Sequence, residues 1–132
     1  FEETALNEMQ HAKDEFKLMN GIGDTAANLK EAIEGEDYET TTMYPEFAKI
    51  AREEGNKEAA ILFDQIAKVE AKHRDRYKRL LEMLQNGTLY QREEPIVWKC
   101  TKCGYKHEGK EPPTICPSCK HPKEYYEPSD LF

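Results

Sequence analysis

Val69-Glu70-Ala71-Lys72-His73 is the most informative stretch of this chain, because it places two polar side chains in an apolar row. Around it, residues spaced alternately four and three apart form the pattern of an inward helix face in a bundle. The members of this row are Ala59, Phe63, Ile66, Glu70, His73, Tyr77, Leu80 and Leu84. The pattern therefore predicts a bundle helix whose Glu70 and His73 point toward the core.

The preceding segments carry inward acids of the same kind. Turn-forming residues at 20–24, 54–56 and 86–87 divide residues 1–91 into three predicted helices. In the first helix Glu8 lies in the inward row, with His11 at its edge. The second helix has Glu39 one position off its row and Tyr44 beside it, and the predicted row is Leu29, Ile33, Glu36, Thr40, Met43, Phe47 and Ile50.

These polar residues are predicted to lie at one depth of the bundle. Glu8 lies 12 residues before Asn20 and Glu36 lies 12 residues after Asp24, so both are about 18 Å from the same turn at 1.5 Å per residue. Counting from the second turn brings the third helix to the same level. One layer is therefore predicted, formed by Glu8, His11, Glu36, Glu39, Glu70 and His73.

A layer of carboxylates and imidazoles is typical of a site for two iron or manganese ions, and Glu-x-x-His sets two ligands on one helix face. Buried carboxylates without a cation are costly. In the alternative interpretation, Glu8 and His11 are surface residues and Glu70 pairs with Lys72 or Arg74. Two interpretations also hold for Tyr44, as a phenol that reaches the layer or as a packed core aromatic.

The four cysteines lie in a second region that begins after Glu93-Glu94-Pro95. Residues 96–132 are rich in turn formers, and so short a segment seldom folds without disulfides or a metal. Two Cys-x-x-Cys pairs favour a tetrahedral metal over disulfides, and their spacing leaves zinc and iron both open. The predicted ligands are Cys100, Cys103, Cys116 and Cys119.

Composition excludes several classes of function. The formal net charge is −7, with no block of basic residues, so binding to nucleic acid is not expected. The apolar runs are too short for a membrane span or a signal peptide. We therefore expect a soluble, cytoplasmic protein that does not insert into a membrane.

Taken together, these motifs resemble those of the rubrerythrin family. The features that carry the resemblance, in order, are Glu8-x-x-His11, Glu36-x-x-Glu39, Thr41-Thr42-Met43-Tyr44-Pro45, Glu70-x-x-His73, Trp98-x-Cys100-x-x-Cys103-Gly104-Tyr105 and Cys116-Pro117-x-Cys119. The resemblance implies an all-α, ferritin-like four-helix bundle at residues 1–91, with three of its helices present in this chain. It also implies a small rubredoxin-like β/loop domain at 96–132. The implied cofactors are a di-iron centre and one iron on four cysteines.

The resemblance further implies a peroxidase that reduces hydrogen peroxide to water in oxidative-stress defence. Electrons would come from a reduced pyridine nucleotide through partner redox proteins and the four-cysteine iron. Glu8 and Glu70 would bridge the two irons, Glu36 and His73 would be terminal ligands, and Tyr44 would hydrogen-bond a ligand carboxylate. Glu39 and His11 would alternate as ligands when the site is oxidised and reduced.

The family's first helix, which supplies a further Glu ligand, has no counterpart here. We expect it to come from a missing or cleaved segment or from another chain, in a homodimer or larger homo-oligomer. Two alternative functions remain open at the level of the sequence. In the first, the bundle is a ferroxidase or iron-handling protein. In the second, the chain is a non-enzymatic zinc-ribbon protein for assembly.

Overall fold

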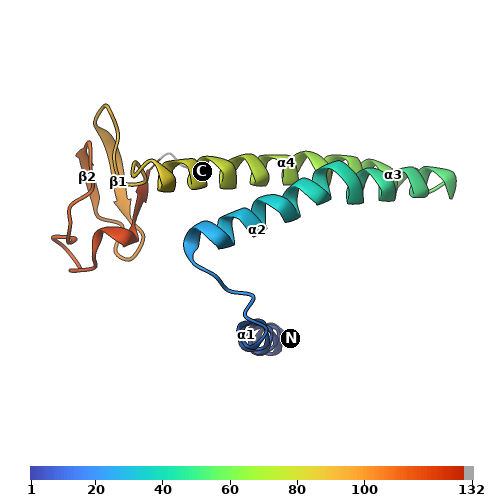
Figure 1. Ribbon diagram of the computed structural model, residues 1–132, viewed down its shortest axis with the longest axis horizontal. Helices are drawn as coiled ribbons and strands as arrows, with labels where there is room; N and C mark the ends of the chain where they lie inside the picture. The colour runs from blue at the N-terminus through green and yellow to red at the C-terminus, as the bar shows by residue number, and fades with distance from the viewer. Residues whose placement is uncertain (130–132) are drawn as a thin grey trace. The chain divides into compact units, whose positions relative to one another are not determined.

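A computed structural model describes residues 1–129 of the chain (Figure 1). It divides the chain into two compact units, Phe1–Glu82 and Met83–Phe132, called unit 1 and unit 2 below. The last three residues of the predicted second domain, 130–132, lie outside the described residues. Among the described residues, none of the helices combines the length and the apolar character that crossing a membrane requires.

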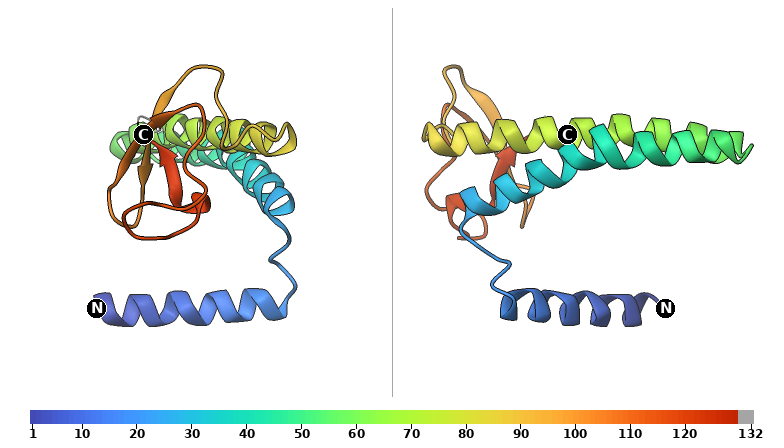
Figure 2. Two further views of the ribbon diagram at one scale, coloured as in Figure 1. Left: turned by 90° about the vertical axis from the view of Figure 1, so that its left-hand side faces the viewer. Right: turned by 45° about the vertical axis from the view of Figure 1, so that its right-hand side comes forward.

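Unit 1 is helical, as the sequence predicts. Its elements are α1 (Glu2–Leu18), α2 (Thr25–Tyr38), the π-helix η1 (Glu39–Met43), α3 (Tyr44–Glu53) and most of α4 (Lys57–Gln85). The segments α2, η1 and α3 follow one another without a break and run beside α4 (Figures 1 and 2). They therefore form one long helical segment, and the three predicted helices are confirmed.

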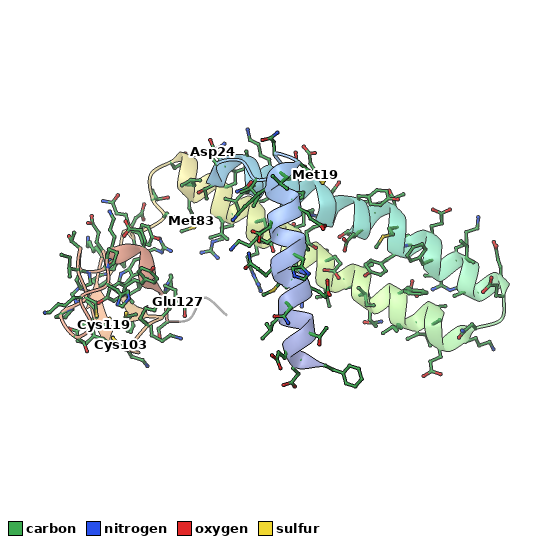
Figure 3. The ribbon with its side chains drawn as sticks, turned by 90° about the horizontal axis from the view of Figure 1, so that it is seen from below. Met19, Asp24, Met83, Cys103, Cys119 and Glu127 are labelled. Carbon is green, nitrogen blue, oxygen red and sulfur yellow. The ribbon has the colours of Figure 1, made fainter. Side chains whose placement is uncertain are left out.

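Local hydrogen bonds fix both ends of the connection between α1 and α2. Asn20 adopts a left-handed conformation with φ 56°, and the Gly21 N–H donates to the Phe16 carbonyl at 3.0 Å. Such a bond closes the last turn of a helix. At the other end the Asp24 side chain, labelled in Figure 3, accepts a hydrogen bond from the Ala27 N–H at 2.8 Å. The ends of both helices are thus set by neighbouring residues alone.

The π-helix η1 arises where an α-helix cannot continue. Pro45 has no N–H, and its ring crowds the carbonyl of Thr41 four residues earlier. The backbone widens instead, so that the Tyr44 N–H bonds to the Glu39 carbonyl five residues back. The Thr41 hydroxyl donates to the Asp37 carbonyl at 2.7 Å. Backbone and side chain together accommodate the proline within a continuous helix.

Beyond this π-helix the predicted inward row is only partly covered. Phe47 and Ile50 are 42% and 43% exposed, whereas Ala48 and Ala51 are buried. Phe47 still packs on Phe63 of α4, so it borders the face toward α4 without being enclosed there. In α4, by contrast, each of the eight predicted inward residues is at least partly buried.

Unit 1 has little apolar interior of its own. Its buried residues, among those described, are Ala48, Ala51 and Ala60, and α1 contributes none. An aromatic group of Tyr44, Phe47 and Phe63 joins α3 to α4, with ring centroids 5.6 to 6.2 Å apart. Several large apolar side chains stay exposed on the helices. The helices therefore resemble part of a bundle more than a closed one.

Two ion pairs also connect the long helical segment to α4. Arg74 Nη1 donates to Asp37 Oδ1 at 3.0 Å, and Arg52 pairs with Asp64. Arg74 also contacts the carboxylate of its neighbour Asp75 at 3.1 Å. Asp37 and Arg74 directly follow Glu36 and His73, so their pair holds α2 and α4 together beside those residues.

Unit 2 contains a small antiparallel sheet. Its strands are β1 (Ile96–Cys100), β2 (Lys106–Gly109) and β3 (Tyr126–Pro128), in the order β2-β1-β3. A short 3-10 helix, η2 (Lys123–Tyr125), precedes β3. The core consists of Trp98, Cys100, Cys116 and Tyr126. The buried Trp98 indole donates to the Gly109 carbonyl at 2.9 Å. This arrangement confirms the predicted small β/loop region after the helices.

Candidate metal centres

The structure brings all four predicted cysteines together in unit 2. Cys100 Sγ lies 3.7 Å from Cys119 Sγ, and Cys103 Sγ lies 3.7 Å from Cys116 Sγ. All four sulfur atoms lie within 4.8 Å of one another, and none is in a disulfide. A tetrahedral ion with metal–sulfur bonds of about 2.3 Å requires sulfur–sulfur distances of about 3.8 Å. The four sulfurs therefore fit a single tetrahedral ion.

Each cysteine pair lies in a similar turn. The Cys100 N–H donates to the Tyr105 carbonyl and the Cys116 N–H to the His121 carbonyl, both at 2.8 Å. The Gly104 N–H donates to the Cys100 carbonyl, and the Lys120 N–H donates to the Cys116 carbonyl. Gly104 and Lys120 are left-handed, with φ 76° and φ 64°. The two turns, 100–105 and 116–121, are called knuckles below.

Backbone amides of the knuckles point at sulfur. The Tyr105 amide lowers the pKa of the Cys103 thiol below its usual range. Burial acts to raise the pKa of Cys116, but hydrogen bonding from Tyr126 and from the Cys119 and Ser118 amides outweighs burial and lowers it to about 6. Such donors stabilise thiolates and hence a bound cation.

The four sulfurs differ in their access to solvent. Cys100 and Cys116 are fully buried in the core, whereas Cys103 is exposed and Cys119 is partly exposed. Figure 3 shows Cys103 and Cys119 near one another at one edge of unit 2. An ion held by the four cysteines would therefore be closest to solvent on the side of Cys103.

In unit 1 the structure brings together Glu36, Glu70 and His73. His73 Nδ1 lies 2.7 Å from Glu70 Oε2 and 3.6 Å from Glu36 Oε2. These residues form a potential metal-binding group with ligand atoms within 4.8 Å of one another. They come from α2 and α4, and the predicted convergence of these residues is therefore confirmed. The alternative pairing of Glu70 with Lys72 or Arg74 is wrong, because Glu70 pairs with His73 and Arg74 with Asp37 and Asp75.

Glu36 gives the clearest sign that this group suits a cation. Burial raises the pKa of Glu36, and the neighbouring Glu70 raises it further, while His73 partly offsets both. The Glu36 Oε2 atom is buried and has no hydrogen-bond partner among the described residues. A buried carboxylate oxygen without a partner is costly unless a proton or a cation occupies it. The donor set, two carboxylates and an imidazole, suits iron.

Tyr44 and Glu39 border this group. Burial raises the pKa of Tyr44, and the carboxylates of Glu39, Glu70 and Glu36 raise it further. The ring of Tyr44 also packs on Phe47 and Phe63. Both interpretations of Tyr44 thus describe part of its surroundings, since it is a packed aromatic next to the carboxylates. Glu39 does not belong to the group of three ligand atoms.

Glu8 and His11 are placed differently from the other predicted ligands. They lie on α1 and pair with each other, with His11 Nδ1 3.3 Å from Glu8 Oε2. Their side chains are 70% and 66% exposed, and neither belongs to the group formed by Glu36, Glu70 and His73. The structure therefore assembles part of the predicted layer, and the roles of Glu8 and His11 remain predictions.

Two features near the site were absent from the sequence-based predictions. The hydroxyl of Thr40, in η1, is buried without a hydrogen-bond partner among the described residues. The pair of Arg74 with Asp37 joins the two ligand-bearing segments at 3.0 Å. Pro45 signals a disturbance of the helix, but the position and type of the irregular turn depend on hydrogen bonds that a pattern does not contain.

Comparison with known proteins finds similarity over both parts of the chain. Residues 1–81 match the family model described as rubrerythrin, and residues 98–127 match the rubredoxin-like domain of rubrerythrin. The chain is 45% identical to a rubrerythrin of Porphyromonas gingivalis, over 97% of this chain and 70% of that protein. It is 42% identical to a rubrerythrin of Nitratidesulfovibrio vulgaris, over 96% of this chain and 73% of that protein.

Solved structures of nigerythrin are also similar. The fully reduced form aligns with a TM-score of 0.48 and 32% identity, over 81% of this chain and 50% of that chain. The mixed-valence form gives a TM-score of 0.47. This chain thus spans half the length of the nigerythrin chains that it matches.

Proposed function

Because the chain belongs to the rubrerythrin family, we propose that it is a di-iron peroxidase that reduces hydrogen peroxide to water. The reaction takes two electrons and two protons for each peroxide and yields two water molecules. The observation that carries the proposal is the combination of two sites in one chain. One is the Glu36, Glu70 and His73 group with its unpartnered carboxylate oxygen, and the other is the four-cysteine site.

The residues of unit 1 would hold the iron pair, which supplies the electrons for O–O cleavage. Glu36, Glu70 and His73 supply ligands from two helical segments. Burial and nearby carboxylates raise the pKa of Tyr44, so its phenol would keep its proton and would donate a hydrogen bond to a ligand carboxylate. Glu39 lies close enough to influence Tyr44 and would serve as the exchangeable ligand.

The residues of unit 2 would relay electrons from a partner redox protein and, ultimately, a reduced pyridine nucleotide. Cys103 gives the four-cysteine iron an exposed side. Both knuckles and the residue after each carry lysines and no acids, although the whole chain has a net charge of −7. The exposed lysines near the cysteines are Lys102, Lys106 and Lys120. This side therefore favours a donor protein that presents carboxylates.

We further propose that a homodimer or larger homo-oligomer completes the site. α1 has no buried residue, and its apolar side chains Leu6, Met9 and Phe16 are exposed. Packing of α1 into a bundle with other helices would cover these side chains and bring Glu8 and His11 to the iron pair. A remaining ligand would come from a further helix, in another segment or another chain.

The test compares Glu70→Ala with the parent protein, each loaded with iron and chemically reduced without air. The parent protein should hold about three irons per chain. Each peroxide accepts two electrons, so full reoxidation of two chains should take about three peroxides, and the four-cysteine irons report it through their visible absorption. Glu70→Ala should lose the bundle irons and this rapid reoxidation but keep the four-cysteine absorption, because Glu70 is one of the three grouped ligands and contacts His73.

Glu82→Ala is the matched control, since Glu82 is exposed and lies on the same helix. It should keep three irons and full reoxidation. Sedimentation of the same samples measures the oligomer. Rapid reoxidation in Glu70→Ala would contradict the site assignment, and faster reoxidation by dioxygen than by peroxide in the parent would favour a ferroxidase.

A further inference from the structure

The hydroxyl of Tyr126 occupies an unusual place in the core of unit 2. Tyr126 begins β3 and pairs across the sheet with Cys100, which directs its ring into the core beside Cys116 and Trp98. The residue is 4% exposed. Its phenol oxygen is buried and has no hydrogen-bond partner of ordinary geometry among the described residues. A buried hydroxyl of this kind is costly unless an acceptor is present.

The Cys116 sulfur can supply this acceptor, because Tyr126 and Cys116 lie in the same small buried cluster. An ordinary phenol keeps its proton at neutral pH and can therefore donate. A neutral thiol accepts hydrogen bonds weakly. A cysteine bound to iron is a thiolate, and a charged acceptor makes a shorter and stronger hydrogen bond. The unpartnered hydroxyl is therefore explained by a ligand thiolate at Cys116.

We propose that the Tyr126 hydroxyl donates a hydrogen bond to the Cys116 thiolate and thereby raises the reduction potential of the four-cysteine iron. Reduction adds one electron to the iron and increases the negative charge on its four sulfurs. A hydrogen bond to sulfur stabilises this more negative state more than the oxidised state. The ring of Tyr126 packs the core, while the hydroxyl adjusts the potential.

This inference uses the four-cysteine iron of the proposed function but does not depend on peroxide turnover. Its test is the reduction potential of iron-loaded Tyr126→Phe, measured by spectroelectrochemistry on the full chain. We expect the equilibrium constant for reduction by a given donor to fall about threefold to tenfold. This corresponds to roughly 30 to 60 mV, at 59 mV per tenfold for one electron. The sulfur-to-iron absorption should shift to longer wavelength, because the thiolate loses a donor.

Tyr125→Phe is the matched control. Tyr125 is adjacent, 37% exposed, and contacts His121 and Lys102 through its ring, which phenylalanine retains. The reduction potential of iron-loaded Tyr125→Phe should equal that of the parent protein. An unchanged potential in Tyr126→Phe would overturn the inference and leave the peroxidase proposal intact. Loss of iron from Tyr126→Phe would also overturn it, because the hydroxyl would then be holding the site rather than adjusting it.

Discussion

The two candidate metal centres differ in how far apart their ligands lie in the sequence. The four cysteines of unit 2 fall between positions 100 and 119, and the strands around them form a buried core with Trp98 and Tyr126. The predicted ligands of unit 1 extend from Glu8 to His73 on separate helices. In unit 2 the structure assembles every predicted ligand, whereas in unit 1 it assembles three of the six.

This difference shows what each kind of site requires. A site made by two short turns depends on hydrogen bonds within those turns, and the knuckles supply them. A site made by helices depends on packing between distant segments, and unit 1 has only small residues fully buried. Helical bundles gain most of their stability from burial of apolar faces. The ligands in unit 1 are therefore held by less apolar burial than those in unit 2, where local hydrogen bonds and a buried core surround the cysteines.

The largest expected effect tests the independence of the two centres. Cys103→Ser should remove the metal from unit 2 and unfold it, because a structural metal contributes on the order of 10 kcal/mol in small metal-held units. Iron in unit 1 should stay bound, so that iron per chain falls by one. The measurement is elemental analysis combined with visible absorption. Loss of all iron would mean that the two centres form cooperatively, contrary to the comparison.

A smaller effect concerns Glu36 in metal-free protein. Its pKa is raised by burial and by Glu70, so the folded state holds this proton at a pH where the unfolded state has released it. Stability then falls as the pH rises above the unfolded pKa of about 4.3 and through the folded value. Glu36→Gln should therefore raise the melting temperature at pH 7, with little gain at pH 4.

Thermal unfolding followed by circular dichroism at both pH values measures this effect. Glu34→Gln is the control, because Glu34 is exposed on the same helix and should change neither melting temperature. An equal gain at pH 4 and pH 7 would assign the effect to packing. With iron bound, Glu36→Gln should instead lower the melting temperature, because the variant loses the carboxylate that binds the cation.

The smallest effect compares equivalent positions in the two knuckles. Lys120 has φ 64°, a conformation that costs a residue with a side chain about 1 to 2 kcal/mol, while Gly104 has φ 76° at little cost. Lys120→Gly should stabilise unit 2 by about 0.5 kcal/mol, and Gly104→Ala should destabilise it by about 1 kcal/mol. Denaturant unfolding of metal-loaded protein measures both. Effects of the same sign would mean that the knuckles are not equivalent.

The sequence predicts those parts of the molecule that depend on regular spacing. The inward row of α4 and both cysteine pairs are confirmed, because a helix period and a four-residue turn place side chains directly. In α3, after the wider turn at η1, Phe47 and Ile50 of the predicted row stay partly exposed while Ala48 and Ala51 are buried. Periodicity assumes an unbroken helix and cannot count the extra residue.

Other parts of the site lie beyond a pattern because they depend on three-dimensional packing. Arg74 and Asp37 lie on two different helices and are 37 positions apart in the sequence, yet they form an ion pair. The depth argument placed Glu8 with Glu36, but matching depth does not bring two helices into contact. α1 carries the correct ligand types and lacks a packed partner within the described residues.

The two knuckles also have a consequence for coordination chemistry. Each knuckle is closed by its own backbone hydrogen bonds and presents two sulfurs as a preformed bidentate chelator. Binding of an ion to four separate side chains would require several costly loop closures. Here the connection of 12 residues between Cys103 and Cys116 is the one long loop to be closed. Unit 2 therefore behaves as a pair of bidentate ligands, and the chelate effect lowers the entropic cost of metal capture.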